Sequence, residues 1–176
     1  MTVAALALST ARTTSSGPTF AQAAEANLDA VYRYLRQLTG NRDIAEDLPS
    51  ETFERALTAW SRYDPTRGPV LPWLVTIARR IALDHFRSDA RRRGRELRAA
   101  AAEVVPESPY ERTADLPPQM AAALAGLTPT EREVVALRVL LDLDGAEAAA
   151  VLGISPSACS TQLHRAMTKL RKELQP

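Results

Sequence analysis

The feature that most constrains this chain is the stretch of residues 144–174, which reads as two helices joined by a very short turn. Asp144 and Glu147 have the spacing of a capping box, which predicts the start of the first helix. Gly153 can adopt the left-handed conformation that ends a helix, and Ser155-Pro156 is typical of the start of the next. This order is the helix-turn-helix plan, in which the second helix enters the major groove of DNA.

Apolar residues at spacings of three and four give the second helix one buried face: Cys159, Leu163, Ala166, Leu170 and Leu174. Hairpins of this kind also occur in all-α proteins that bind no DNA, so the pattern alone leaves both interpretations open. Small residues near the turn allow a close helix crossing. DNA binding is favoured further by four cations that we expect to be exposed: Arg165, Lys169, Arg171 and Lys172.

The composition predicts an all-α protein, because the apolar residues are mostly alanine and leucine and no alternating strand pattern appears. With one cysteine and only His85 and His164, we expect no internal disulfide, metal site or cofactor. No nucleophile–base pair or glycine-rich phosphate loop points to an enzyme. No run of about 18 apolar residues predicts a membrane span, so we expect no membrane insertion and a cytoplasmic location.

The chain divides into four parts by composition: a disordered tail (1–19), a helical domain (20–98), a linker (99–119) and a second helical domain (120–176). In the first domain we expect helices at Phe20–Leu38 and Asp43–Trp60, the latter interrupted by Pro49, and a third helix opening at Pro72. The first helix carries one apolar face of Leu28, Val31, Leu35 and Leu38.

The second domain opens with a capping box at Thr128 and Glu131, with Pro129 at the first helical position. We expect the helix that follows to direct five apolar residues into a core shared with the helix-turn-helix: Val134, Val135, Leu137, Leu140 and Leu141.

A basic block follows Pro72, with arginines at 79, 80, 87, 91, 92, 93, 95 and 98. Such a run is either solvated surface or a binding site for nucleic-acid phosphates. Trp73, His85 and Phe86 lie among the arginines, and aromatic side chains beside cations suit unstacked single-stranded bases. Trp73 and Phe86 are equally consistent with core positions.

The order of these parts resembles a bacterial sigma factor of the extracytoplasmic-function (ECF) family, within the sigma-70 family. DIAEDLPSETFERAL (43–57) and WLVTIARRIALDHFR (73–87) resemble the sigma-2 domain, and residues 127–171 resemble the sigma-4 domain. The resemblance implies an alternative sigma factor that binds core RNA polymerase and promoter DNA, recognises the −10 and −35 elements and helps to open the duplex. It also implies an anti-sigma protein as a further partner.

The resemblance assigns three sets of residues. Contact with the polymerase falls to the helix carrying Asp43, Asp47, Ser50, Glu51 and Phe53. The −10 element, with one base flipped from the stack, falls to Tyr63, Arg67, Trp73, Arg79, Arg80, Asp84, His85 and Arg87. The −35 element falls to Ser155, Ser157, Ser160, Thr161, Gln162, Arg165 and Lys169.

Some residues depart from the family pattern. Pro49-Ser50 replaces a non-proline residue and glutamine, and Arg80 stands where asparagine is frequent. Ser160 and Gln162 replace two common cations, which predicts fewer phosphate contacts at −35. The competing interpretation is a dimeric helix-turn-helix regulator that binds a palindromic site and not core polymerase. A helical scaffold without nucleic-acid contacts is the remaining alternative.

Overall fold

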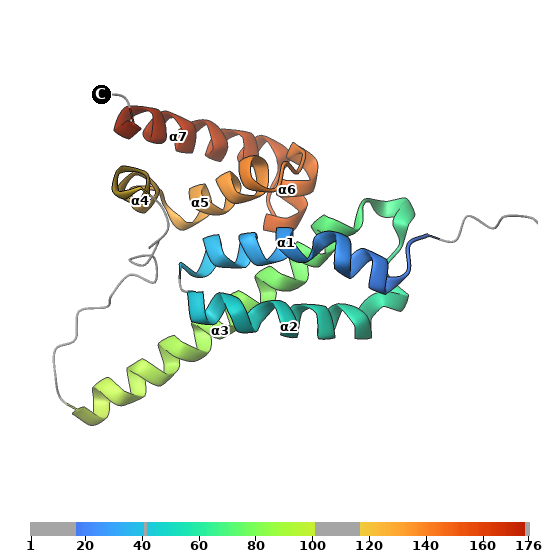
Figure 1. Ribbon diagram of the computed structural model, residues 1–176. Helices are drawn as coiled ribbons and strands as arrows, with labels where there is room; N and C mark the ends of the chain where they lie inside the picture. The colour runs from blue at the N-terminus through green and yellow to red at the C-terminus, as the bar shows by residue number, and fades with distance from the viewer. Residues whose placement is uncertain (1–16, 41, 101–116, 175–176) are drawn as a thin grey trace, which may run out of the picture.

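The structure is a computed structural model that describes residues 17–40, 42–100 and 117–174. Most of the predicted tail and most of the predicted linker lie outside these residues. The described chain is all-α, as predicted (Figure 1). Among its helices, none is both long enough and apolar enough to cross a membrane.

The first unit is a bundle of three helices: α1 (Phe20–Thr39), α2 (Arg42–Ala59) and α3 (Val70–Ala100). Two single 3₁₀ turns, η1 (Trp60–Arg62) and η2 (Pro65–Arg67), connect α2 to α3. A capping box between Thr19 and Gln22 starts α1, and Gly40 ends it with φ 60°. The three helices pack pairwise, because each presents an apolar face to the other two.

Two expectations for this unit are wrong. Leu28 is 50% exposed, so it does not belong to the buried face of α1, although Ala23 before it and Val31 after it are buried. Pro49 does not interrupt α2, which runs unbroken from Arg42 to Ala59 with Pro49 buried inside it. Burial of the neighbouring Ala45 and Leu48 offsets the hydrogen bond that a proline cannot donate.

The second unit comprises α4 (Pro118–Ala125), α5 (Pro129–Val135), the π-helical turn η3 (Ala136–Leu140), α6 (Gly145–Leu152) and α7 (Pro156–Leu174). The capping boxes at Thr128 and Asp144 are confirmed, as is the left-handed Gly153 (φ 69°) between α6 and α7. The π turn was not expected. It widens the helix after Val135, so that Leu140 is exposed and not part of the core as predicted.

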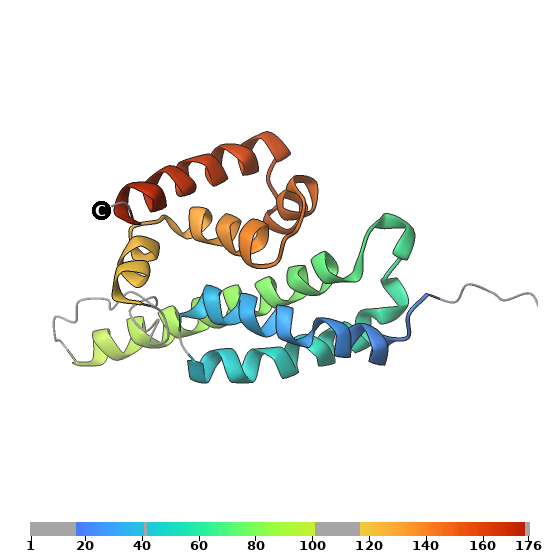
Figure 2. The same cartoon turned by 45° about the horizontal axis from the view of Figure 1, so that its top comes forward.

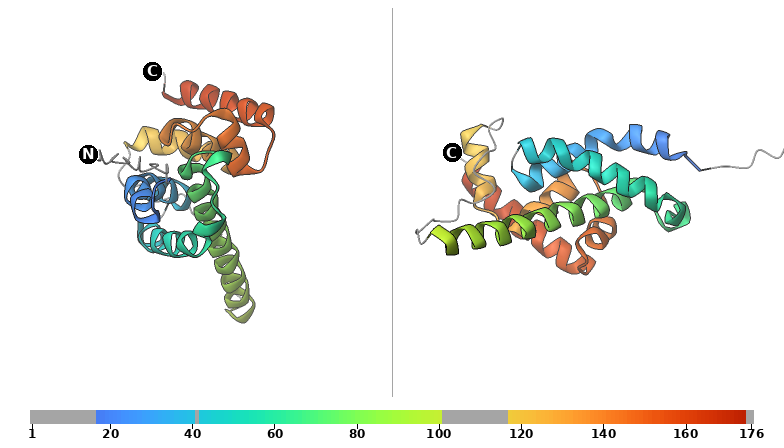
Figure 3. Two further views of the ribbon diagram at one scale, coloured as in Figure 1. Left: turned by 90° about the vertical axis from the view of Figure 1, so that its right-hand side faces the viewer. Right: turned by 90° about the horizontal axis from the view of Figure 1, so that it is seen from below.

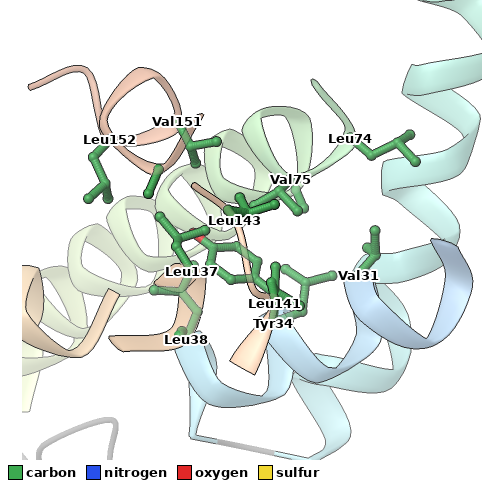
Figure 4. Close-up of a cluster of buried hydrophobic side chains, with 14 of the residues drawn as sticks. Val31, Tyr34, Leu38, Leu74, Val75, Leu137, Leu141, Leu143, Val151 and Leu152 are labelled. Carbon is green, nitrogen blue, oxygen red and sulfur yellow. The ribbon is translucent and has the colours of Figure 1, made fainter. Parts of the chain in front are cut away.

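The two units pack against each other and share one interior (Figures 1 and 2). Figure 4 shows Tyr34 and Leu38 of α1 beside Leu137 of η3 and Leu141, with Val75 of α3 near Leu143. All of these side chains belong to a single buried apolar cluster. A smaller cluster of Ala123, Leu127, Ala166 and Leu170 attaches α4 to α7. The position of α7, the helix expected to read DNA, is therefore set by α4, α5 and α6 together.

Candidate nucleic-acid interface

The outer face of α7 is polar and open. Ser157, Ser160, Thr161 and Arg165 are exposed, and Gln162 is half-buried. The opposite face buries Cys159, Ala166 and Leu170, as the spacing predicts. Burial raises the pKa of the Cys159 thiol, as expected for a residue of the core. Most of the residues assigned to the −35 element thus lie on the exposed side of α7.

The amino terminus of α7 is capped by Ser155, whose hydroxyl accepts a hydrogen bond from the Ala158 amide at 3.2 Å. The Ser155 and Ser157 hydroxyls lie 3.0 Å apart. A helix amino terminus carries partial positive charge and spare N–H donors, so this end of α7 suits a phosphate oxygen.

A shallow groove beside this face is lined by the start of α5 and the middle of α7: Thr128, Thr130, Glu131, Gln162, His164, Arg165, Thr168 and Lys169. Lys169 donates to Glu131 at 2.7 Å, and the Glu131 side chain is only 4% exposed. Burial acts to raise the pKa of Glu131, but hydrogen bonds from Lys169 and Thr128 outweigh it and hold the pKa below its ordinary value. The ammonium group of Lys169 is therefore already engaged in an ion pair within the protein.

At the start of α3, four aromatic rings form a half-buried cluster. Trp60 stacks on Tyr63 with ring centres 4.9 Å apart, and it meets Phe20 and Trp73 edge-on. The Tyr63 hydroxyl donates to the Gly68 carbonyl at 3.1 Å. These contacts hold the loop that carries Arg67, which is exposed, against the first turn of α3.

Further along α3, the residues assigned to the −10 element divide between two faces. Arg80, Asp84 and Arg87 share one exposed face, with Arg87 and Asp84 paired at 3.1 Å. His85 Nδ1 lies 3.6 Å from an Asp89 carboxylate oxygen.

Arg79 faces the second unit instead. Its Nε donates to Glu133 Oε2 of α5 at 2.9 Å, and the two side chains are 25% and 9% exposed. In this arrangement Arg79 is an interior contact between the units, so it reaches DNA only if they separate.

The residues assigned to polymerase contact lie on α2. Asp47 and Ser50 are exposed, and the half-buried Glu51 pairs with Arg55 at 2.5 Å. Phe53 packs against the apolar cluster, so it positions the helix and does not face outward. The side chain of Asp43 lies outside the described part of the chain.

Two family models match the chain in order. Residues 23–92 match Sigma-70 region 2, and residues 119–170 match Sigma-70, region 4. The first match covers most of α1, all of α2 and most of α3, and the second runs from α4 through most of α7.

Curated relatives agree over most of the chain. The ECF RNA polymerase sigma factor SigC of Mycobacterium tuberculosis is 33% identical over 99% of this chain and 92% of its own length. BldN of Streptomyces coelicolor, also an ECF RNA polymerase sigma factor, is 37% identical over 83% of this chain and 56% of its own length. The chain belongs to the ECF family of RNA polymerase sigma factors.

Two solved structures share the arrangement of this one. RpoE from Bartonella quintana, in complex with the anti-sigma factor NepR, superposes with a TM-score of 0.68 and 26% identity, covering 88% of this chain and 96% of that one. CnrH in complex with the cytosolic domain of CnrY gives a TM-score of 0.63 and 27% identity, covering 88% and 86%.

For this sigma factor, the structure brings most of the predicted −35 residues onto one face of α7. It brings Tyr63 and Trp73 together, but it directs Arg79 away from Arg80 and Arg87. The residues beside these sites that were not predicted as site residues are Phe20 and Trp60 in the aromatic cluster, and Thr128, Thr130, Glu131, His164 and Thr168 in the groove. The spacing of Trp60 and Tyr63 could have indicated a stacked pair.

Proposed function

We propose that the chain directs core RNA polymerase to promoters through three separate surfaces. The exposed face of α2 around Asp47 and Ser50 meets the polymerase. The loop from Tyr63 and the outer face of α3 hold the −10 element, and the outer face of α7 reads the −35 element. The chain would then act in the cytoplasm, where the polymerase works.

The observation that carries this proposal is the conjunction of the two sigma-70 regions in order on one chain with an exposed polar face on α7. A dimeric regulator of palindromic sites does not need region 2, and the comparisons do not favour it. We further propose an anti-sigma protein as a partner, since RpoE was solved in complex with the anti-sigma factor NepR.

The test is run-off transcription from a genomic library by purified bacterial core polymerase, with and without the chain. We expect promoter-specific transcripts only with the chain. Arg165→Ala should reduce transcription that depends on the −35 element, because it removes an exposed guanidinium from the outer face of α7.

Arg171→Ala is the matched control, since Arg171 is also an exposed arginine on α7 but is not among the residues assigned to the −35 element and lies about 120° around the helix from Arg165. If Arg165→Ala leaves output and promoter choice as they are, the assignment of the recognition face is wrong. If the chain binds a palindromic duplex as a dimer and never associates with core polymerase, the whole proposal fails.

A further inference from the structure

The carboxyl-terminal part of α3 projects away from the other helices (Figure 3). The last fully buried side chain described on α3 is Ala82, and Phe86 is the last that packs against the apolar cluster. Beyond it, residues 87–95 are exposed except for Asp89 and Gly94, which are half-buried. Burial of this segment therefore contributes little to stability, and its charged side chains are accessible to a binding partner.

Four arginines form a stripe along this helix: Arg80, Arg87, Arg91 and Arg95. Their spacings of 7, 4 and 4 residues place them within about 80° of arc on a helix of 3.6 residues per turn. The stripe covers about 22 Å at 1.5 Å per residue, which is the axial length of about six base pairs of duplex DNA. Arg92 and Arg93 point to other sides of the same segment.

The far end of the stripe is not neutralised by described residues. No described carboxylate lies within ion-pair distance of Arg91 or Arg95, whereas Asp89 pairs with Arg92 at 3.5 Å and Asp84 pairs with Arg87. A row of guanidinium groups suits a partner whose negative charges repeat along a line, and it suits phosphates in particular.

The stripe contains no aromatic side chain. Proteins that hold single-stranded bases stack them on aromatic rings, and here those rings gather around Tyr63 and Trp73 at the opposite end of α3. His85 and Phe86 lie on other sides of α3, and Phe86 packs against the apolar cluster. Beyond Phe86 the described residues of α3 can therefore hold backbone phosphates, but they offer no ring on which an unpaired base could stack.

We propose that Arg91 and Arg95 extend the binding surface of α3 beyond the −10 residues and hold the phosphate backbone of duplex DNA without reading its sequence. The inference rests on the proposed function for the identity of the nucleic acid as promoter DNA. Along α3, unpaired bases would then lie at the aromatic end and paired DNA at the arginine end.

The test uses the full-length chain and a fluorescent duplex of random sequence, about 30 base pairs long, with anisotropy measured between about 50 and 200 mM salt. Each phosphate contact contributes about 0.9 to the slope of log affinity against log salt. The double variant Arg91→Gln/Arg95→Gln should therefore lower the slope by about 1.8. The ratio of the parent's affinity to the variant's affinity should then change about tenfold over this range of salt.

The matched control is Arg92→Gln/Arg93→Gln, which removes the same charge from the same exposed segment but from outside the stripe. We expect the slope of this control to stay close to that of the parent. An equal reduction of the slope by both variants would show diffuse charge attraction and would overturn the proposal that the stripe binds the duplex. A parent chain without salt-dependent duplex binding would also overturn it.

Two further probes identify the ligand. A greater effect of the Arg91/Arg95 variant on a single-stranded oligonucleotide of the same length would reject duplex binding. An effect confined to poly-glutamate would indicate an acidic protein instead. Because these measurements need no polymerase, a chain that supports transcription but shows no slope change rejects the stripe alone. A slope change without transcription rejects the proposed function alone.

Discussion

The ion pair between Arg79 and Glu133 links the two units, and a double-mutant cycle can measure its contribution. Arg79→Met removes the guanidinium with much of the side-chain length retained, and Glu133→Gln removes the charge with the shape retained. The cycle compares both single variants with the double variant. The difference isolates the coupling between the two groups from the cost of each substitution alone.

The structure sets the expected size of this coupling. At 2.9 Å and an effective dielectric constant of about 20, the attraction is about 6 kcal/mol before desolvation. Both side chains lose most of their hydration, since 25% of Arg79 and 9% of Glu133 remain exposed, and this cost cancels most of the attraction. We expect a net coupling of about 1.5 kcal/mol, in the range of a charge-assisted hydrogen bond.

Urea unfolding supplies the free energies. Fluorescence of Trp60 and Trp73 follows the first unit, and circular dichroism follows all the helices. Because the units share one core, we expect the two signals to change together in the parent chain. A cycle of Arg80→Met with Glu133→Gln is the control, since Arg80 is the exposed neighbour of Arg79 and should show no coupling.

A coupling below about 0.5 kcal/mol for the Arg79–Glu133 cycle, within the usual error of additivity, would refute the role of this pair. Separate midpoints for fluorescence and circular dichroism would refute the shared core as a source of cooperativity. A coupling of the expected size would also mean that any promoter contact by Arg79 begins with the loss of this pair.

Two further predictions concern the second unit. Asp142 has φ 53°, a conformation that costs most L residues about 1–2 kcal/mol and a β-branched residue at least as much. Asp142→Val should therefore lower the free energy of unfolding in urea by about 1–2 kcal/mol. Asp142→Asn is the control and should be nearly neutral. A loss below about 0.5 kcal/mol for valine would contradict this account. The pKa of Glu131 in the folded chain lies below its ordinary value of 4.5. The ionised Glu131 therefore contributes fully to the free energy of unfolding above pH 4.5, and this contribution is lost as the pH falls through the folded pKa. Lys169→Met removes one of the groups that lower this pKa, so unfolding followed from about pH 7 to pH 3 should show a smaller acid-induced loss than in the parent; equal losses would exclude the pair as a cause.

The local signals in the sequence predicted most of the second unit. The helix ends marked by the capping boxes, Gly153 and Ser155-Pro156 depend on residues within a few positions of each other. They can therefore be predicted without knowledge of the rest of the fold. The apolar face of α7 is equally local, and Cys159, Ala166 and Leu170 are buried as expected.

The errors have tertiary causes. Spacing alone placed Leu28 and Leu140 in the core, but Leu28 lies on the exposed side of α1 although Ala23 and Val31 are buried, and the π turn rotates Leu140 outward. Pro49 was expected to interrupt α2, but packing on both neighbouring helices keeps that helix intact.

The candidate site was predictable as a set of positions but not as an arrangement. The resemblance named Arg79 and Lys169, and nothing in the order of residues showed that Glu133 and Glu131 would engage them. Both pairs join residues 38 or more positions apart, beyond the reach of any local pattern.

The common interior of Tyr34, Leu38, Leu137 and Leu141 also limits how the halves can be exchanged between relatives. A chimera that takes residues 20–100 from this chain and the remainder from a homologue would join two surfaces that were shaped against other partners. Substitutions in the two halves should therefore compensate one another, and the tolerance of one half to change will depend on which other half it is given.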